Sequence, residues 1–222
     1  MEQELQRRRY NLIEKYYPET GKLSRHAYPK HMRFFEAGRV HRERCMMAAN
    51  RVGKTDAACY ELTCHLTGIY PKWWEGRKFN TPIDTWLAGD TSTTVRDILQ
   101  KKLFGEYNDI GSGFIPGAKV AKTTNKSGIR EAIDTAAIRH ESVSRFDGYS
   151  TMVMKSYDQG RKSFQGGKPI IILLDEEPPQ DVYTECLLRT MTNNGMIILT
   201  FTPLMGMTEL IYTYLEPGKE LK

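Results

Sequence analysis

The sequence predicts an α/β fold in which a mostly parallel central sheet is flanked by helices. Three observations support this class. Short apolar runs alternate along the chain with segments of helical character. A Gly-Lys-Thr sequence stands where the first apolar run passes into the helix that follows it, and three consecutive carboxylates follow the apolar run 170–174. Alternating strands and helices are typical of βαβ units packed around a parallel sheet.

Each predicted element rests on a local signal. Short runs of branched and apolar residues predict strands, and longer runs of helix formers predict helices. The predicted strands cover 45–49, 83–88, 132–139, 151–155, 170–174 and 196–200. The predicted helices cover 2–17, 29–35, 53–67, 93–104, 182–191 and 208–214. Residues 105–127 are predicted to be irregular or a hairpin, and Asp147-Gly148 is predicted to be a turn.

Length and composition fit a single domain covering 1–222, in which 216–222 reads as the start of a linker. The chain has 222 residues, 40% of them hydrophobic, and its net charge of +5 is compatible with a nucleic-acid partner without requiring one. No apolar run approaches the roughly 20 residues that span a bilayer, and the charged N-terminus carries no secretory signal. We therefore expect no membrane partner.

Cysteine usage favours a reduced, intracellular protein, because the four cysteines form no C-x-x-C pair. Cys45, Cys59, Cys64 and His65 are conceivable zinc ligands, but their spacing fits no common zinc site. Buried free thiols are therefore the preferred interpretation.

Residues 48–55, Ala-Ala-Asn-Arg-Val-Gly-Lys-Thr, match the Walker A phosphate loop except that Ala48 replaces its first glycine. Gly53 lets backbone N–H groups close around phosphate oxygens, and the helix that follows adds its positive dipole end. Lys54 is expected to reach the β- and γ-phosphates, and the Thr55 hydroxyl to bind Mg²⁺. The candidate nucleotide-binding residues are Ala49, Asn50, Arg51, Val52, Gly53, Lys54, Thr55 and Asp56.

The strand predicted at 170–174 leads into Asp175, Glu176 and Glu177, which form an acidic partner for the phosphate loop. Carboxylates at the carboxyl ends of parallel strands face the ligand crevice. Asp175 is expected to hold Mg²⁺, and Glu176 to act as general base toward the attacking water. The second carboxylate favours hydrolysis, so a small-molecule kinase is the least favoured alternative. Glu177 is kept out of the catalytic set.

Four segments in a fixed order carry a resemblance to a known family: residues 50–55, residues 156–166, Arg189, and residues 199–208. Together they resemble the N-terminal ATPase domain of terminase large subunits, the DNA-packaging motors of tailed bacteriophages. The likeness covers most of the chain from about residue 28 onward. It implies a P-loop ATPase of the additional-strand, catalytic-glutamate type that hydrolyses ATP with Mg²⁺ and works as a ring at a capsid portal.

The resemblance also implies roles for residues outside the two motifs. Thr200 and Thr202 match a coupling motif, with Thr202 as the hydroxyl that senses the γ-phosphate. The family often has a glutamine that reads adenine, and His31 stands at the matching place. Residues 1–40 are therefore expected to form an N-terminal helical extension with the adenine-side segment.

An arginine finger is expected because such motors stabilise charge on the transferring phosphoryl group with a guanidinium. Arg161 is the first candidate, donated to the neighbouring subunit. Arg51 is a candidate acting in cis, and Arg139 and Arg145 stay open.

A translocating motor must grip DNA without reading its bases, so Lys and Arg contacts to phosphates are the expected chemistry. Residues 72–78, which include Trp73 and Trp74, and the basic stretch 101–130 are candidates. Surface solubility and loop packing explain these residues equally well. For Arg7, Arg8 and Arg9, a solvated helix face is preferred over contact with DNA or a neighbouring subunit.

The partners implied by the resemblance are double-stranded DNA, a portal protein with its procapsid, and a small terminase subunit, met in the host cytoplasm. A homo-oligomeric ring is implied when assembled, and a monomer is allowed for the isolated domain. Family members normally carry a nuclease domain after the ATPase, and we expect no DNA cleavage by this chain. Two alternatives stay open: another P-loop DNA-dependent ATPase of helicase-like or repair type, and an assembly module that binds nucleotide but hydrolyses it weakly.

Overall fold

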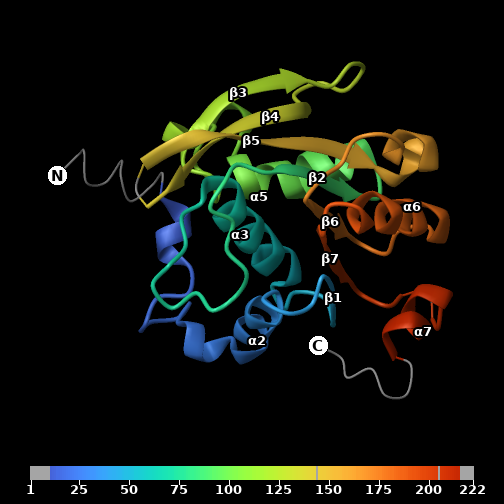
Figure 1. Cartoon of the computed structure of the whole chain (residues 1–222), viewed down its shortest axis with the longest axis horizontal. Helices are drawn as coiled ribbons and strands as arrows, with labels where there is room; N and C mark the ends of the chain where they lie inside the picture. Colours follow the sequence, from blue (N-terminus) through green and yellow to red (C-terminus); the bar gives the residue numbers. More distant parts are fainter. Residues whose placement is uncertain (1–10, 144, 205, 216–222) are drawn as a thin grey trace.

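A seven-stranded sheet forms the centre of the computed structural model, which describes residues 11–143, 145–204 and 206–215 (Figure 1). The strands are β1 (Glu43–Met47), β2 (Asp84–Gly89), β3 (Val120–Asn125), β4 (Ile133–Ser142), β5 (Arg145–Ser156), β6 (Ile171–Asp175) and β7 (Met196–Phe201). Their order is β1-β7-β6-β2-β5-β4-β3. The first five in this order pair in parallel, and β4 and β3 continue the sheet in antiparallel pairing.

The position of β7 defines the class of the sheet. β7 lies between β1, which leads into the phosphate loop, and β6, which ends at Asp175. Its register places Thr200 beside Met46 on one side and beside Asp175 on the other. A strand inserted between the phosphate-loop strand and the acidic strand is the additional strand that the resemblance implies. The predicted α/β fold with a mostly parallel sheet is confirmed.

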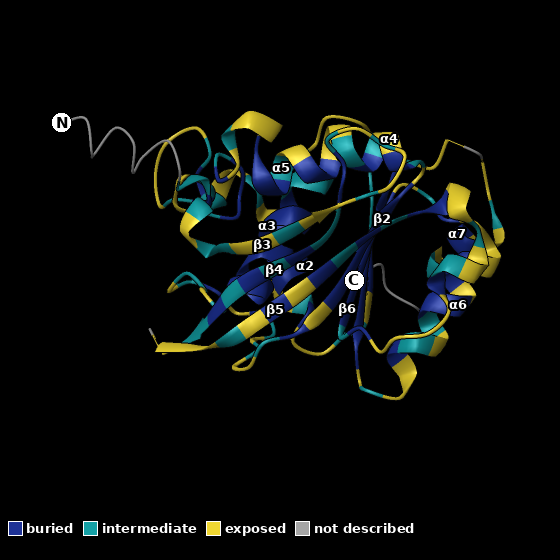
Figure 2. Ribbon diagram, turned by 90° about the horizontal axis from the view of Figure 1, so that it is seen from above, coloured by how far each residue is buried: buried dark blue, intermediate teal, exposed yellow. Residues whose placement is uncertain are grey.

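Helices cover both faces of this sheet (Figures 1 and 2). The α-helices are α2 (Pro29–Ala37), α3 (Lys54–Thr67), α4 (Ser92–Thr94), α5 (Lys101–Phe104), α6 (Gln180–Met191) and α7 (Glu209–Leu215), and η3 (Val95–Gln100) is a π-helix between α4 and α5. Short 3-10 turns are η1 (Leu12–Lys15), η2 (Arg25–Ala27), η4 (Tyr107–Asp109), η5 (Gly117–Lys119), η6 (Tyr157–Gln159) and η7 (Arg161–Phe164). None of the helices in the described part of the chain combines the length and apolarity that a membrane span needs.

The core has two parts because alternate residues of each central strand point to opposite faces. Ile171 and Leu173 of β6 pack in the cluster that includes α3, while Ile172 and Leu174 pack in the cluster that includes α6. A strand buried on both faces reads as a continuous apolar run. This is why β6 and β7 could be predicted from the sequence.

The N-terminal helix predicted over 2–17 is wrong in its described part. Only Leu12–Lys15 forms a helical turn, of 3-10 type, and Tyr16 is already extended. Tyr17 has φ 57° and precedes Pro18, and a residue before proline is disfavoured in the α conformation. Tyr17 is buried against Tyr60 and Phe35, which draws the chain into the core. Residues 2–10, including Arg7 to Arg9, and the expected linker at 216–222 lie outside the described residues.

The turn predicted at Asp147-Gly148 is also wrong, because these residues lie inside β5. β4 ends at Ser142 and β5 begins at Arg145, so the connection is shorter and earlier. The register shifts opposite His140 and leaves Asp147 as the extra residue of a bulge, with Gly148 at φ 145°. Glycine signals both turns and bulges, and here the bulge is the cause.

A buried ion pair joins β1 to α3. The Arg44 guanidinium donates to both Glu61 carboxylate oxygens at 3.1 and 2.7 Å and to the Phe34 carbonyl at 2.6 Å. Both side chains are 0% exposed. The Glu61 carboxylate also lies 3.2 Å from His65 Nε2. Burial acts to raise the pKa of Glu61, but the Arg44 charge and these hydrogen bonds outweigh it and leave that pKa below its usual value.

We predict that Glu61→Ala lowers the free energy of unfolding by about 3–5 kcal/mol, because it leaves the Arg44 charge buried without a counter-ion. The double variant Arg44→Met/Glu61→Leu should recover most of this loss, since it removes both charges while filling the space. Urea unfolding at pH 7 measures both variants. A double variant no more stable than Glu61→Ala would show that packing, not the unpaired charge, causes the loss.

Candidate active site

The phosphate loop joins the carboxyl end of β1 to the first turn of α3. Arg51 at φ 64° and Gly53 at φ 83° turn the backbone through left-handed conformations. A Cβ at Gly53 would lie 3.1 Å from His31 Cε1, so both conformation and space require glycine there. Alternating left-handed residues before a helix N-terminus turn backbone N–H groups toward one concave anion site.

Lys54 is buried and links the phosphate loop to the end of β7. Its Nζ donates to the carbonyls of Ala48 and Ala49 at 3.0 and 2.9 Å, and to Thr202 Oγ1 at 2.8 Å. Thr202 Oγ1 in turn donates to Asn50 Oδ1 at 2.7 Å. The structure therefore places Asn50, Lys54 and Thr202 in one hydrogen-bonded group.

Asp175 gathers hydroxyls from two elements. Its Oδ1 accepts from Thr55 Oγ1 at 2.9 Å and from Thr200 Oγ1 at 2.6 Å. Burial raises the pKa of Asp175, and the hydrogen bonds from Thr200 and Thr55 oppose that rise. A carboxylate beside a threonine hydroxyl is the hard oxygen donor set that Mg²⁺ prefers, so Thr55 and Asp175 fit the metal expected there.

Glu176 follows Asp175 with its backbone in the left-handed region at φ 65°. Its N–H donates to the Thr200 carbonyl at 2.8 Å, and the Tyr157 hydroxyl donates to the carbonyls of both Asp175 and Glu176 at 3.1 Å. Burial raises the pKa of the Glu176 carboxyl, and the Asp175 charge raises it further. Such backbone conformations in residues other than glycine are held by their surroundings and are common at functional sites.

A cavity of about 310 Å³ adjoins the phosphate loop on the side of α2. Its lining residues are Tyr16, Tyr17, Leu23, Tyr28, His31, Arg51, Val52, Gly53 and Asp56. His31 is buried in its wall, where Nδ1 lies 2.8 Å from the Tyr17 hydroxyl and Nε2 lies 3.1 Å from the Val52 carbonyl. Both ring nitrogens therefore have partners, and His31 links the phosphate loop at Val52 to the Tyr17 side chain. Burial lowers the pKa of His31, which favours the neutral ring.

The tyrosines of this cavity were not among the residues singled out from the sequence. Tyr28 stacks on His31 with ring centroids 5.2 Å apart, and Tyr16 packs edge-on against Phe114. The available signal was aromatic residues close before Pro18 and Pro29, which also fits an ordinary turn.

The part of the chain that carries this site matches a known protein family. A family described as "Terminase large subunit, T4likevirus-type, N-terminal" matches residues 45–219, which include the phosphate loop, Asp175 and Glu176. The chain belongs to the terminase large subunit family.

One curated relative and two solved structures are similar to this chain. The terminase large subunit of Salmonella phage P22 is 35% identical, over 88% of this chain and 42% of that protein. The chain thus spans less than half the length of this relative. The large terminase ATPase domain of Thermus phage P74-26, solved as a mutant, covers 79% of this chain and 64% of its own, with TM-score 0.54 and 14% identity. The large terminase of another thermophilic bacteriophage covers 78% and 37%, with TM-score 0.50 and 8% identity. At these identities, both structures show the shared fold.

The arginine candidates of the terminase domain lie in different places. Arg51 is exposed in the phosphate loop, beside the 310 Å³ cavity. Arg161 lies on η7 against α6, where its half-exposed side chain donates to Glu185 at 2.9 Å. Glu185 is buried and also pairs with Arg189 at 2.6 Å. Arg139 pairs with Glu141 at 3.2 Å on the antiparallel part of the sheet.

The remaining predicted residues fall outside the group around Asp175. Asp56 lies in the first turn of α3 and pairs with Lys102 at 2.7 Å. The four cysteines are buried free thiols, as preferred from the sequence. Cys45 packs in the core cluster on the α6 face, whereas Cys59 and Cys64 pack in the cluster on the α3 face.

We predict that Thr200→Val lowers the free energy of unfolding by about 1.5–3 kcal/mol at pH 8, because a buried carboxylate loses a charge-assisted hydrogen bond. Thr63→Val is the matched control, since Thr63 is equally buried but donates to the neutral Cys59 carbonyl. Its loss should be about 1 kcal/mol or less. Equal losses in the two variants, measured by urea unfolding, would count against a special role of the Asp175 charge.

Proposed function

We propose that this domain hydrolyses ATP and that hydrolysis drives the translocation of double-stranded viral DNA into a procapsid. The observation that carries the proposal is the meeting of three elements at one point. The phosphate loop supplies Lys54 and Thr55, and the end of β6 supplies Asp175 and Glu176. The end of β7 supplies two hydroxyls, of Thr200 to Asp175 and of Thr202 to Lys54. A site of this composition contains the groups that hydrolysis of a nucleoside triphosphate requires.

Each residue has a distinct task in this proposal. Backbone N–H groups of the phosphate loop and Lys54 bind the phosphates and stabilise the charge that develops on them. Glu176 accepts a proton from the attacking water, and its raised pKa brings it closer to the working pH than an ordinary glutamate. Thr55 and Asp175 would hold Mg²⁺, which neutralises phosphate charge when bound.

The end of β7 is the proposed coupling element. Thr202 contacts Lys54, and Thr200 contacts Asp175, so one strand end touches groups that bind the phosphates and groups that bind the metal. A change in either contact on phosphate release is passed to the segment after Phe201. We assign phosphate sensing to Thr202 because its hydroxyl links Lys54 to Asn50 within the phosphate loop.

The 310 Å³ cavity is the proposed place of the adenine. Tyr16 and Tyr28 offer aromatic surface to a base, and the cavity adjoins the phosphate loop. His31 supports this wall through Tyr17 and Val52.

The assembly proposed around this domain is a ring at the portal of a procapsid in the host cytoplasm, acting with a small terminase subunit. Membership of the terminase family supports it. Two alternatives make different predictions. A helicase-like or repair ATPase would act without a portal, and a weakly hydrolysing assembly module would show no hydrolysis that depends on Glu176.

We predict that Glu176→Gln lowers kcat for ATP by about 10²–10⁴-fold and leaves the Kd for ATP within a few-fold, because the substitution removes only the proton acceptor. Glu177→Gln is the matched control. The Glu177 carboxylate accepts a hydrogen bond from Thr208, just before α7, whereas Thr55 and Thr200 donate to Asp175. Steady-state hydrolysis and nucleotide titration distinguish the two. Loss of ATP binding in Glu176→Gln would contradict the role as base.

We predict that hydrolysis rises more than linearly with protein concentration and that Arg161→Ala lowers it about 10³-fold or more at unchanged ATP affinity, as expected for a finger donated between subunits. Arg189→Ala is the control, because it breaks the other half of the shared Glu185 pairing. Activity that is first-order in protein and indifferent to Arg161 would remove this residue as the finger.

A further inference from the structure

A hollow of about 490 Å³ lies at the amino-terminal edge of the parallel strands, away from the phosphate loop. Its walls come from residues 38–42 before β1, residues 76–78 before β2, and the residue that precedes Gly195 and β7. The strands between the two edges have five or six residues, so the hollow and the phosphate loop are roughly 20 Å apart. The polar lining consists of Arg39, His41, Arg42, Arg77, Lys78 and Asn194.

The lining of this hollow is cationic. Four of its nine residues are Arg or Lys, a fifth is His41, and none of the nine is Asp or Glu. The like charges act on one another: burial lowers the pKa of Arg77, and the Arg42 charge lowers it further. The positive side chains of this wall repel one another. An anion that enters the hollow is attracted by all of them and relieves this repulsion.

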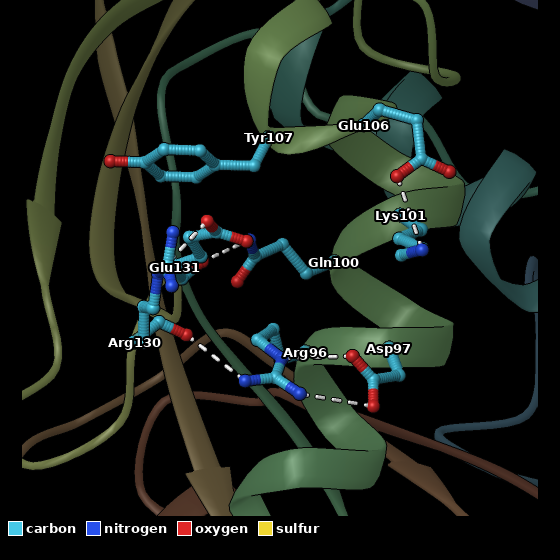
Figure 3. A pocket seen from close by; sticks show the side chains of 8 residues that line it. All are labelled: Arg96, Asp97, Gln100, Lys101, Glu106, Tyr107, Arg130 and Glu131. Carbon is cyan, nitrogen blue, oxygen red and sulfur yellow. Dashed lines mark hydrogen bonds and ion pairs between the residues drawn. The ribbon is translucent and has the colours of Figure 1, made fainter.

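A second hollow on the surface differs from the cationic hollow, because its lining contains carboxylates as well as cations. This second hollow has a volume of about 380 Å³ and lies between η3, α5 and the residues before β4. Figure 3 shows its lining side chains, in which each cation has a carboxylate neighbour. The three pairs are Arg96 with Asp97, Lys101 with Glu106, and Arg130 with Glu131, at 2.8, 3.1 and 3.3 Å. The nine residues that line the cationic hollow include no such carboxylate, so its charge is available to a ligand.

Two arginines of the cationic hollow are held in place by the backbone. Arg42 donates to the Gly195 carbonyl at 3.0 Å through Nε and to the Thr190 carbonyl at 2.8 Å. Arg77 donates to the Asn194 carbonyl at 3.2 Å and lies over the Phe79 ring at 4.8 Å. Guanidinium groups fixed in this way lose little conformational entropy when they bind an anion.

We propose that the cationic hollow binds backbone phosphates of double-stranded DNA. A duplex is too wide to enter the hollow, but its phosphates can seat there while Arg39 and Lys78, both at the surface, reach neighbouring phosphates. Contacts of this kind depend on charge and carry no base sequence, as a translocating motor needs. The inference rests on the proposed function and names the DNA surface of the same domain.

The location gives this surface a mechanical relation to the active site. The chain passes from Asn194 and Gly195 at the hollow directly into β7, whose other end carries Thr200 and Thr202. Arg42 likewise precedes β1, which leads into the phosphate loop. DNA phosphates bound at the hollow would therefore contact residues directly before β1 and β7, the two strands whose other ends reach the proposed nucleotide site.

The test compares two charge-reversal pairs in the whole chain. Arg39→Glu/Lys78→Glu changes the cationic hollow, and Lys101→Glu/Arg130→Glu changes the hollow of Figure 3. Each pair reverses one Arg and one Lys, so both variants lower the net charge of +5 by the same amount. Affinity for a fluorescent duplex of about 30 base pairs, a length that exceeds two helical turns, is measured by anisotropy as a function of salt. Urea unfolding confirms that both variants are folded.

We expect the first pair to weaken duplex binding and to reduce the slope of log K against log salt by about 1.8, since each lost phosphate contact removes about 0.9. The control pair should change the slope by much less. Three results would overturn the proposal: no duplex binding by the unsubstituted chain, unchanged slope in the first pair, or equal changes in both pairs. Displacement of the duplex by poly-L-glutamate at equal charge concentration would also overturn it and assign the hollow to an acidic protein segment.

The result of the duplex-binding test can be distinguished from that of the test of ATP hydrolysis. Hydrolysis without added DNA should be unchanged in Arg39→Glu/Lys78→Glu, because neither residue contacts the Asp175 cluster. Glu176-dependent hydrolysis together with an unaltered duplex affinity in this pair would leave the ATPase standing and reject only the DNA surface.

Discussion

The buried pair of Arg44 and Glu61 is the constraint on which the site depends. It ties the strand that enters the phosphate loop to the helix that leaves it, and Arg44 also holds α2 through the Phe34 carbonyl. A phosphate loop works only if its two ends keep their spacing, because the backbone N–H groups must point at one anion. The cost of burying two charges limits where such a pair is tolerated, and here each charge neutralises the other through two hydrogen bonds.

The second constraint is the insertion of β7 between β1 and β6. Without it, the phosphate loop and the acidic strand would have no shared neighbour. With it, Thr200 and Thr202 come from one strand end and contact Asp175 and Lys54, which belong to different motifs. Tyr157 adds a third element by holding the carbonyls of Asp175 and Glu176, which keeps Glu176 in its left-handed conformation.

The sequence was sufficient where function depends on local pattern. The phosphate loop needs Gly53, Lys54 and Thr55 in consecutive positions, and a doubly buried strand such as β6 needs an unbroken apolar run. It was insufficient where contacts are long-range. Lys54 and Thr202 are 148 residues apart, and only a family resemblance suggested that they meet.

Two kinds of local ambiguity account for the errors. Glycine at 148 signals a turn or a bulge, and only the pairing of β4 with β5 decides between them. The periodic apolar residues before Pro18 suggested a helix, but burial of Tyr17 in an aromatic cluster outweighed the weak helix propensity of a short segment. The same cluster carries the tyrosines that line the cavity beside the phosphate loop.

The two margins of the sheet have a consequence for self-association. β1 and β3 are edge strands, each with one row of backbone groups unpaired within the sheet. Charged side chains lie beside the outer margin of β1, namely Lys30, Arg33, Glu36 and Arg39, while β3 contains Lys122 and two register irregularities. Edge lysines and bulges are the devices by which proteins prevent sheets from joining edge to edge. Joining of two copies of this domain edge to edge into one continuous sheet is therefore disfavoured at both margins.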